Sequence, residues 1–116
     1  MTVEISLTEH AVVTVVAIRG SVDSLNADQL STAFAARIGQ GRVNLVADFS
    51  AVTYTSSAGL RSLLAAVKDC RRHGGDLRIA ALQPQVERVL SISGFTNMIK
   101  IFVDREGAVE SFQACA

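Results

Sequence analysis

The chain has 116 residues, of which 49% are hydrophobic and 19% charged, as in a single folded domain and unlike a disordered chain. Its 11 basic and 11 acidic side chains give a formal net charge of zero, which argues against a dedicated nucleic-acid-binding surface. The sequence has neither a secretion-signal pattern nor an apolar stretch of membrane-spanning length, so we expect a cytoplasmic protein with no membrane partner.

The N-terminal segment predicts two strands of a hairpin. Apolar and polar residues alternate over residues 3–7, which is the period of a strand with one buried face. After a turn at Glu9 and His10, residues 11–19 are rich in Val and Ile and predict the second strand. Residues 20–24 (Gly-Ser-Val-Asp-Ser) then predict a loop.

A first helix is predicted over residues 25–38, with Ser24 or Asn26 as its N-cap. Glycines at positions 39 and 41 end it. Its buried face is marked by three apolar residues spaced four apart: Leu30, Phe34 and Ile38.

The middle of the chain predicts a strand, a helix and another strand. Residues 43–49 are mostly apolar and too few for a helix, so they predict a central strand buried on both faces. Residues 57–73 predict a helix that ends before Gly74-Gly75, and residues 77–81 predict the next strand. The apolar positions of this helix are Leu60, Leu63, Leu64 and Val67.

The C-terminal part predicts two more helices with a strand between them. Pro84 suits the first turn of a helix that ends near Gly94, and residues 99–103 predict a short strand. Asp104 can cap a closing helix. The inward residues of the two helices are predicted to be Val86, Val89, Leu90, Val109 and Phe112.

The predicted order is β-β-α-β-α-β-α-β-α, with about four helices, so the fold class is α/β. Helices between consecutive strands favour parallel pairing, whereas the first two strands form an antiparallel hairpin, which together give a mixed sheet. No linker, repeat or low-complexity segment interrupts the chain, so residues 1–116 are predicted to be one domain.

No pattern in the sequence indicates a catalytic or metal site. Cys70 and Cys115 are isolated thiols, and His10 and His73 lack neighbours at metal-ligand spacing. No nucleophile elbow and no phosphate-binding glycine loop is present. We therefore predict that the protein is not an enzyme and that it needs neither cofactor nor metal.

A polar cluster runs directly into the apolar helix of residues 57–73. It comprises Thr53, Thr55, Ser56 and Ser57. In the simpler interpretation, a serine here only caps the helix. In the functional one, a phosphate on Ser57 lies at the positive end of the helix dipole, with Arg61 one turn along.

Residues 54–60 (Tyr-Thr-Ser-Ser-Ala-Gly-Leu) resemble the signature of the STAS domain, as found in bacterial anti-sigma factor antagonists. In that family the serine at the place of Ser57 is phosphorylated by the anti-sigma factor, a histidine-kinase-like serine kinase. The family's usual aspartate before this serine is replaced here by Ser56, which makes Ser56 a competing acceptor.

The resemblance covers nearly the whole chain. Residues 20–23 (Gly-Ser-Val-Asp) are similar to the family loop whose aspartate, here Asp23, lies near the phosphorylated serine and takes part in kinase contact. Residues 73–76 resemble the Gly-Gly turn before the family's fourth strand, and residues 86–95 resemble a later pattern that ends in Gly-Phe. The resemblance thus implies one STAS domain over residues 1–116.

The function that the resemblance implies is partner switching. The unphosphorylated protein would bind the anti-sigma kinase and free a sigma factor, phosphorylation of Ser57 would release the kinase, and a serine phosphatase would reset the switch. Thr55 is expected to be partly exposed, and the spacing of Leu60 and Leu64 also suits core residues. The partner-binding residues implied are Ser21, Asp23, Ser24, Thr55, Ser56, Ser57, Leu60, Arg61 and Leu64.

Two other functions remain open at this point. The chain could be a soluble STAS subunit of a lipid or anion transport system, in which no phosphorylation is needed. It could also be a partner-switching protein whose output lies outside transcription.

Overall fold

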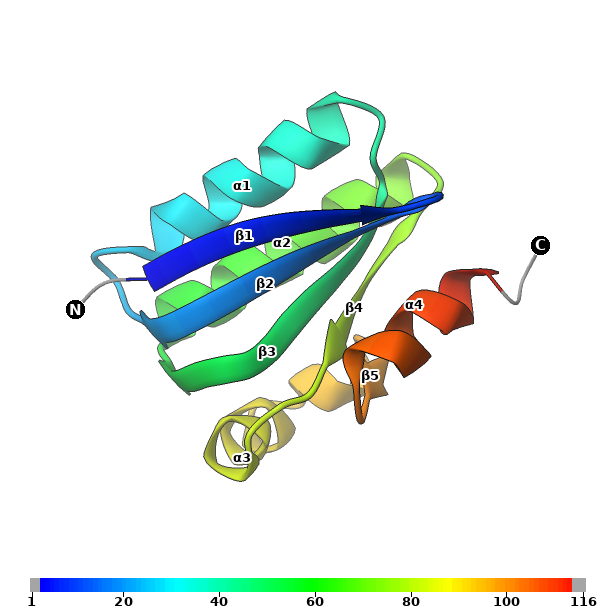
Figure 1. Cartoon of the computed structure of the whole chain (residues 1–116). Coiled ribbons are helices and arrows are strands. Elements are labelled where there is room, and N and C mark those ends of the chain that lie inside the picture. The colour runs from blue at the N-terminus through cyan, green and yellow to red at the C-terminus, as the bar shows by residue number, and fades with distance from the viewer. Residues whose placement is uncertain (1–2, 114–116) are drawn as a thin grey trace.

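The computed structural model describes residues 3–113 and contains a five-stranded sheet in the order β1-β2-β3-β4-β5 (Figure 1). The first pair of strands is antiparallel and the other three pairs are parallel, as predicted. The strands are β1 (Val3–His10), β2 (Val13–Val22), β3 (Asn44–Thr55), β4 (Asp76–Ala80) and β5 (Ile101–Phe102). The helices are α1 (Ala27–Gly39), α2 (Ser57–Arg72), α3 (Pro84–Ile92), the 3-10 turn η1 (Phe95–Asn97) and α4 (Arg105–Gln113).

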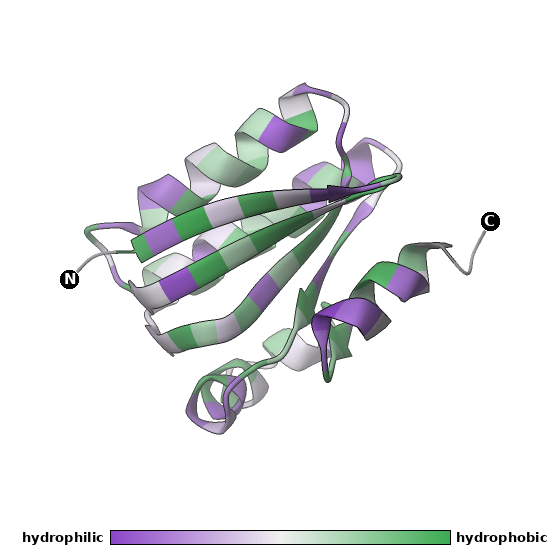
Figure 2. Cartoon of the chain, in the orientation of Figure 1, coloured by the Kyte–Doolittle hydropathy of each residue, from purple (hydrophilic) through white to green (hydrophobic). Residues whose placement is uncertain are grey.

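The sheet has helices on both faces. Side chains of α1, α2 and α3 pack with one face of the strands into the main core, which includes Phe34, Leu63 and Leu90. On the opposite face, Ala108 and Val109 of α4 pack on a smaller apolar cluster of β2, β3 and β4. Hydrophobic and hydrophilic residues alternate along β1 (Figure 2), as in a strand with one exposed face, whereas β2 is mostly apolar because its side chains are buried on both faces.

The hairpin turn lies two residues later than predicted. β1 continues through His10, and the turn is formed by Ala11 and Val12, with Ala11 in a left-handed conformation (φ 42°). The guanidinium of Arg42 holds this end of the hairpin, since it pairs with Glu9 (2.8 Å) and donates to the carbonyl oxygen of Ala11 (2.8 Å). Contacts from a distant part of the chain thus extend β1 beyond its alternating pattern.

The two central strands are longer than predicted. β2 continues through Val22, so the predicted loop at residues 20–24 is shorter, and β3 continues from Phe49 to Thr55. The strands pair as far as Val22 and Thr55, with register shifts between Ala17 and Ser21 that let pairing resume. Each strand therefore stabilises the polar end of the other.

The helix predictions need smaller corrections. α1 begins at Ala27 rather than Leu25, and Leu25 lies exposed in the preceding loop. Val89 of α3 is exposed rather than inward, because Val86 and Leu90 already occupy the buried face. β5 comprises only two residues, although Ile99, outside it, is buried.

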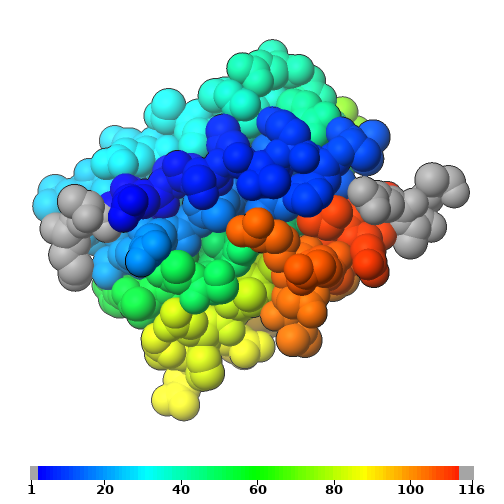
Figure 3. Space-filling model, viewed as in Figure 1, coloured from blue at the N-terminus to red at the C-terminus, as the bar shows by residue number. Residues whose placement is uncertain are grey.

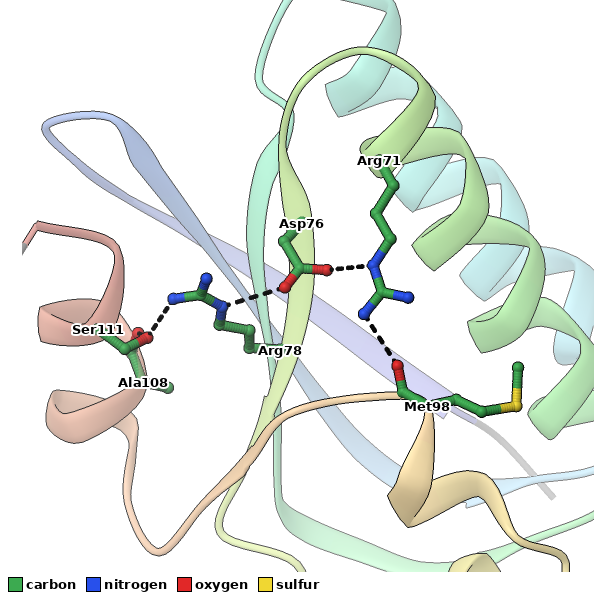
Figure 4. A network of polar contacts seen from close by, with 6 residues as sticks. All are labelled: Arg71, Asp76, Arg78, Met98, Ala108 and Ser111. Atoms are coloured by element: carbon green, nitrogen blue, oxygen red, sulfur yellow. Dashed lines mark hydrogen bonds and ion pairs between the residues drawn. The ribbon is translucent and has the colours of Figure 1, made fainter. Parts of the chain in front are cut away.

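α4 begins and attaches through polar contacts. Asp104 caps it as predicted, since its Oδ1 accepts a hydrogen bond from the Gly107 amide (2.7 Å). Arg105 forms an ion pair with Asp48 of β3 (2.7 Å). Figure 4 shows a second link, in which Asp76 binds the guanidinium of Arg78, which in turn donates to Ser111 (2.7 Å). The small helix is thus held by charged contacts at both ends.

The predictions about single residues elsewhere can also be placed. Cys70 is a free, buried thiol, and burial raises its pKa to about 12, so the thiol stays protonated and unreactive at neutral pH. Cys115 lies outside the described residues. Within residues 3–113 no helix is both long and apolar enough to cross a membrane.

Candidate functional site

The candidate site forms where β2 and β3 end side by side. Val22 and Thr55, the last residues of the two strands, are partners in the parallel ladder. The residue after β3 continues the contact, because the Ser56 amide donates to the carbonyl oxygen of Val22 (2.8 Å). The loop of residues 23–26, called the Asp23 loop below, and the start of α2 are therefore neighbours in space (Figure 1).

The Asp23 loop is held by two reciprocal side chains. Oδ1 of Asp23 accepts from the amides of Leu25 (2.9 Å) and Asn26 (3.1 Å). The buried Asn26 returns the contact, since its Oδ1 accepts from the Asp23 amide (2.8 Å) and its Nδ2 donates to the Ser21 carbonyl oxygen (2.9 Å). Asn26 is the N-cap position of α1, as predicted in one alternative, but its side chain fixes the loop rather than capping the helix.

Asn26 is thus a site-positioning residue that the sequence analysis treated only as a cap. The signal that could have identified it is the spacing of Asp23 and Asn26, because an aspartate and an asparagine three residues apart can each bond the other's backbone. Leu25 lies between them with 89% of its surface exposed.

The two serines at the start of α2 have different roles. Ser56 is the N-cap: its Oγ accepts from the Gly59 amide (3.3 Å), and its carbonyl oxygen accepts from the Leu60 amide (3.1 Å). Ser57 is the first helical residue, and its side chain is exposed. The capping and switching interpretations of this cluster therefore fall on different residues.

Gly59 allows α2 to rest on the ends of the strands. A Cβ atom at this position would lie 2.8 Å from Cγ1 of Val22 and closer still to Oγ1 of Thr55, and both contacts are shorter than real Cβ atoms tolerate. Only glycine fits here without displacing Val22 or Thr55. Gly59 therefore lets the first turn of α2, which carries Ser57, pack close to the ends of β2 and β3.

The predicted partner-binding residues differ in exposure. Two of them are buried, Ser21 (9% exposed) and Thr55 (4% exposed), so the expectation of a partly exposed Thr55 was wrong. Both belong to strands that pair to their ends, and Oγ of Ser21 lies 3.3 Å from Oγ1 of Thr53. The exposed members are Ser24, Ser57 and Arg61, and the half-buried ones are Asp23, Ser56, Leu60 and Leu64.

Apolar groups border this surface. Leu60 and Leu64 pack partly against the main core, and their remaining surface faces outward. Leu25 and Tyr54 (51% exposed) are exposed apolar side chains near the strand ends that the sequence analysis did not assign to the site. Leu25 could have been noticed because it lies outside the four-residue spacing of the buried face of α1.

The surroundings of Ser57 suit a residue that receives a phosphate rather than one that catalyses a reaction. Within residues 3–113 no side chain hydrogen-bonds to Ser57, so no base is in place to activate its hydroxyl as a nucleophile. The first turn of α2 contains no acidic residue, and the amides of Ser57 and Ala58 have no intrahelical acceptor because they begin the helix. Such a helix start can accommodate a phosphate. The described residues also contain no cluster of metal-ligating side chains.

Comparisons with known proteins agree with this architecture. Residues 4–108 match the family model of the STAS domain. A protein of Bordetella bronchiseptica, the candidate anti-sigma factor antagonist BtrV, is 38% identical over 96 residues, which are 83% of each chain.

Solved structures share the fold. An anti-sigma factor antagonist from Mycobacterium paratuberculosis superposes with a TM-score of 0.87 at 24% identity, covering 95% of this chain and 93% of that one. The antagonist SpoIIAA in its unphosphorylated form gives a TM-score of 0.83 at 18% identity, covering 96% and 97%. The phosphorylated form of this Bacillus protein gives 0.74 at 17% identity, covering 94% and 99%.

Proposed function

This chain is a member of the STAS domain family, and from that premise we propose that it is an anti-sigma factor antagonist that works by partner switching. The unphosphorylated protein binds an anti-sigma factor and thereby frees the sigma factor. That anti-sigma factor is a histidine-kinase-like serine kinase, which uses ATP to phosphorylate Ser57. A separate serine phosphatase removes the phosphate, and all of these steps take place in the cytoplasm.

The observation that carries the proposal is the position of Ser57. It is the exposed first residue of α2, beside the Asp23 loop, and the capping role belongs to its neighbour. Ser56 is the less suitable acceptor, because it is half-buried and its Oγ already accepts from the Gly59 amide. A kinase can therefore modify Ser57 without first breaking the cap of the helix.

A phosphate at Ser57 changes the charge of this surface and leaves the fold intact. It adds about −1.5 to −2 charges at neutral pH, and the free amides of the helix start stabilise that charge. The carboxylate of Asp23 lies on the adjacent loop, so the phosphate concentrates negative charge on the surface formed by the two strand ends.

The partner surface combines these charged groups with apolar side chains. Leu25 and Leu60 offer apolar contact area, whereas Asp23 and Arg61 offer charges at its border. A kinase that packs against this surface must desolvate the new phosphate or move away from it. A loss of about 3 kcal/mol in binding free energy weakens such a complex more than about a hundredfold.

In this scheme the protein is a ligand and a substrate, and the catalyst is the kinase. The absence of a base at Ser57 within the described residues suits this role, since the kinase supplies the catalytic groups.

The test is phosphorylation of the purified protein by an anti-sigma kinase from the same organism, with the modified residue identified by mass spectrometry. We expect phosphate on Ser57 in the wild type, none in Ser57→Ala, and unchanged modification in Ser56→Ala and in the exposed α3 control Ser91→Ala. Ser57→Asp should bind the kinase about a hundredfold more weakly than Ser57→Ala. Phosphate on Ser57→Ala, or equal affinity of the two variants, would contradict the proposal.

A further inference from the structure

The free edge of β1 is the feature that the proposed function leaves unused. We propose that this edge, residues 3–10, pairs with the same edge of a second copy of the chain. The two β1 strands run antiparallel around a two-fold axis and join the two sheets into one.

The β1 edge is long and regular, with Glu4 and Glu9 as its charged residues. β1 has eight residues and, within residues 3–113, only β2 beside it, and the two strands pair without a register shift. Edge strands of monomeric proteins are commonly short, bulged, or protected by proline or lysine. β5, at the other edge, is short, with two residues, whereas β1 contains neither proline nor lysine. Figure 3 shows the side chains of β1 (dark blue) uncovered on the face of the sheet that α4 also occupies, with α1 (cyan) along the strand.

The hairpin turn determines which backbone groups of the edge are free. His10 and Val13 flank a two-residue turn, so they form a hydrogen-bonded pair and direct their amide and carbonyl groups toward each other. Because direction alternates along a strand, the odd-numbered residues of β1 direct theirs outward. Ile5, Leu7 and Glu9 thus offer a row of donors and acceptors to another strand.

The side chains favour one register of the pair. A two-fold axis that keeps α1 on the same face in both copies pairs odd residues with odd and even with even. With Leu7 on the axis, Leu7 faces its own copy, Ser6 faces Thr8, and Glu4 faces His10 on both sides of the axis. These are an apolar contact, a pair of hydroxyls and a carboxylate with an imidazole, and each is a favourable cross-strand pair. The remaining pair in this register places Ile5 beside Glu9, whose carboxylate is already held by Arg42.

The exposure of these side chains suits the contact. Leu7 is 42% exposed, and Glu4, Ser6 and Thr8 are also exposed. Nε2 of the half-buried His10 is buried and has no hydrogen-bond partner within residues 3–113. The neighbouring register, with Ser6 on the axis, would place Glu4 opposite Thr8 and leave His10 without a charged partner.

The adjacent helix leaves room for a second copy. α1 directs Ser31 and Ala35 toward α2, and its opposite flank carries Ala33 and Arg37. Arg37 pairs with Glu9 of its own β1 (3.8 Å), so its long side chain is held on its own sheet, and Ala33 leaves space beside it.

The association is tested by sedimentation equilibrium of the wild-type protein over a range of concentrations. We expect a dimer of twice the 12.3 kDa chain mass, and a protein that stays monomeric up to about 1 mM overturns the proposal. Leu7→Lys places two ammonium groups on the axis and should raise the dimer dissociation constant at least about tenfold. The control Val103→Lys, at a 94% exposed apolar residue outside β1, should leave it unchanged.

The register is tested by cysteine cross-linking in a Cys115→Ser background, in which the buried Cys70 is unreactive. Ser6 and Thr8 face each other across a non-hydrogen-bonded pair, where Cα atoms lie about 4.5 Å apart and a disulfide fits. Mixed Ser6→Cys and Thr8→Cys chains should therefore cross-link on oxidation, and neither variant alone should do so. Cross-linking of Ser6→Cys alone overturns this register. Binding of the anti-sigma kinase, which uses the C-terminal ends of β2 and β3, should be unaffected by Leu7→Lys in the middle of β1, so the two proposals fail independently.

Discussion

Single side chains decide how closely the start of α2 approaches the sheet. Gly59 lies against Val22 and Thr55, the last residues of the two paired strands, and no larger residue fits there. Ser56 caps the same turn, and Asn26 fixes the neighbouring loop. The position of Ser57 therefore depends on residues that would not themselves be modified.

Replacement of this glycine tests that dependence. Gly59→Ala should lower the free energy of unfolding by about 1–3 kcal/mol, because the new methyl group must displace Val22 or Thr55. The matched control is Gly39→Ala in the last turn of α1, where a Cβ atom meets nothing within 4 Å. Urea unfolding followed by circular dichroism measures both, and equal effects of the two substitutions would contradict the role assigned to Gly59.

The residues of the site were predictable to different extents. Ser57 and Asp23 could be assigned because the motifs that carry them are local in sequence. The burial of Thr55 and Ser21 could not, since it results from pairing between strands that α1 separates in the chain. The role of Asn26 in the loop could not be predicted either, because the sequence does not show which backbone groups its side chain bonds.

At the scale of elements, α4 is the helix that depends most on a buried charge. Asp48 lies on β3, facing α4, and pairs with Arg105. Burial raises the pKa of Asp48, but hydrogen bonds from Ser50 and the charge and hydrogen bond of Arg105 outweigh it, so the pKa lies below its usual 3.8. The native state thus favours the ionised carboxylate.

The lowered pKa of Asp48 sets the pH dependence of the ion pair that attaches α4 to β3. Because the native pKa is lowered, the stabilisation is fully present above about pH 4 and is lost as the pH falls through the native value. Asp48→Asn should lower the free energy of unfolding by about 1–3 kcal/mol at pH 7, and the difference from the wild type should shrink toward pH 3. Urea unfolding at both pH values measures this. The exposed Glu110→Gln on the same helix serves as control, and a pH-independent difference would contradict the assignment.

The bounds of the elements show where local pattern is insufficient. The apolar run that predicted the strand at residues 43–49 ends at Phe49, yet β3 continues for another six residues because β2 pairs with it. α3 was placed correctly at its start, because proline at the first helical position is a local signal. Val89 was misplaced because helical spacing alone does not say how much of a short helix the core covers.

At the scale of the whole molecule, the topology was predictable from the alternation of strands and helices, since short connections leave few arrangements. The sequence did not predict which helices lie on which face of the sheet, because both faces of the central strands are apolar and either could be covered. The result is a continuous sheet covered by helices on both faces, with the candidate switch at one end of its central strands.

A modification at that end should therefore stay local. Phosphorylation of Ser57 should leave the melting temperature within about 4 °C of the unmodified protein, because the side chain is exposed and the helix start accepts negative charge. Hydrogen exchange measured by mass spectrometry should change only in the Asp23 loop and the first turn of α2. Altered exchange in α3 or α4 would instead indicate a rearrangement of the domain.

The parallel pairing of β2 with β3 also bears on when the site comes into existence. The two halves of the site are separated in the chain by all of α1, so they meet only after the crossover has closed, which is a slow, non-local step of folding. A chain still emerging from the ribosome, or one partly unfolded by heat, carries Ser57 without Asp23 beside it. Under the proposed function, the kinase would respond to the number of completed molecules rather than to the number of chains synthesised.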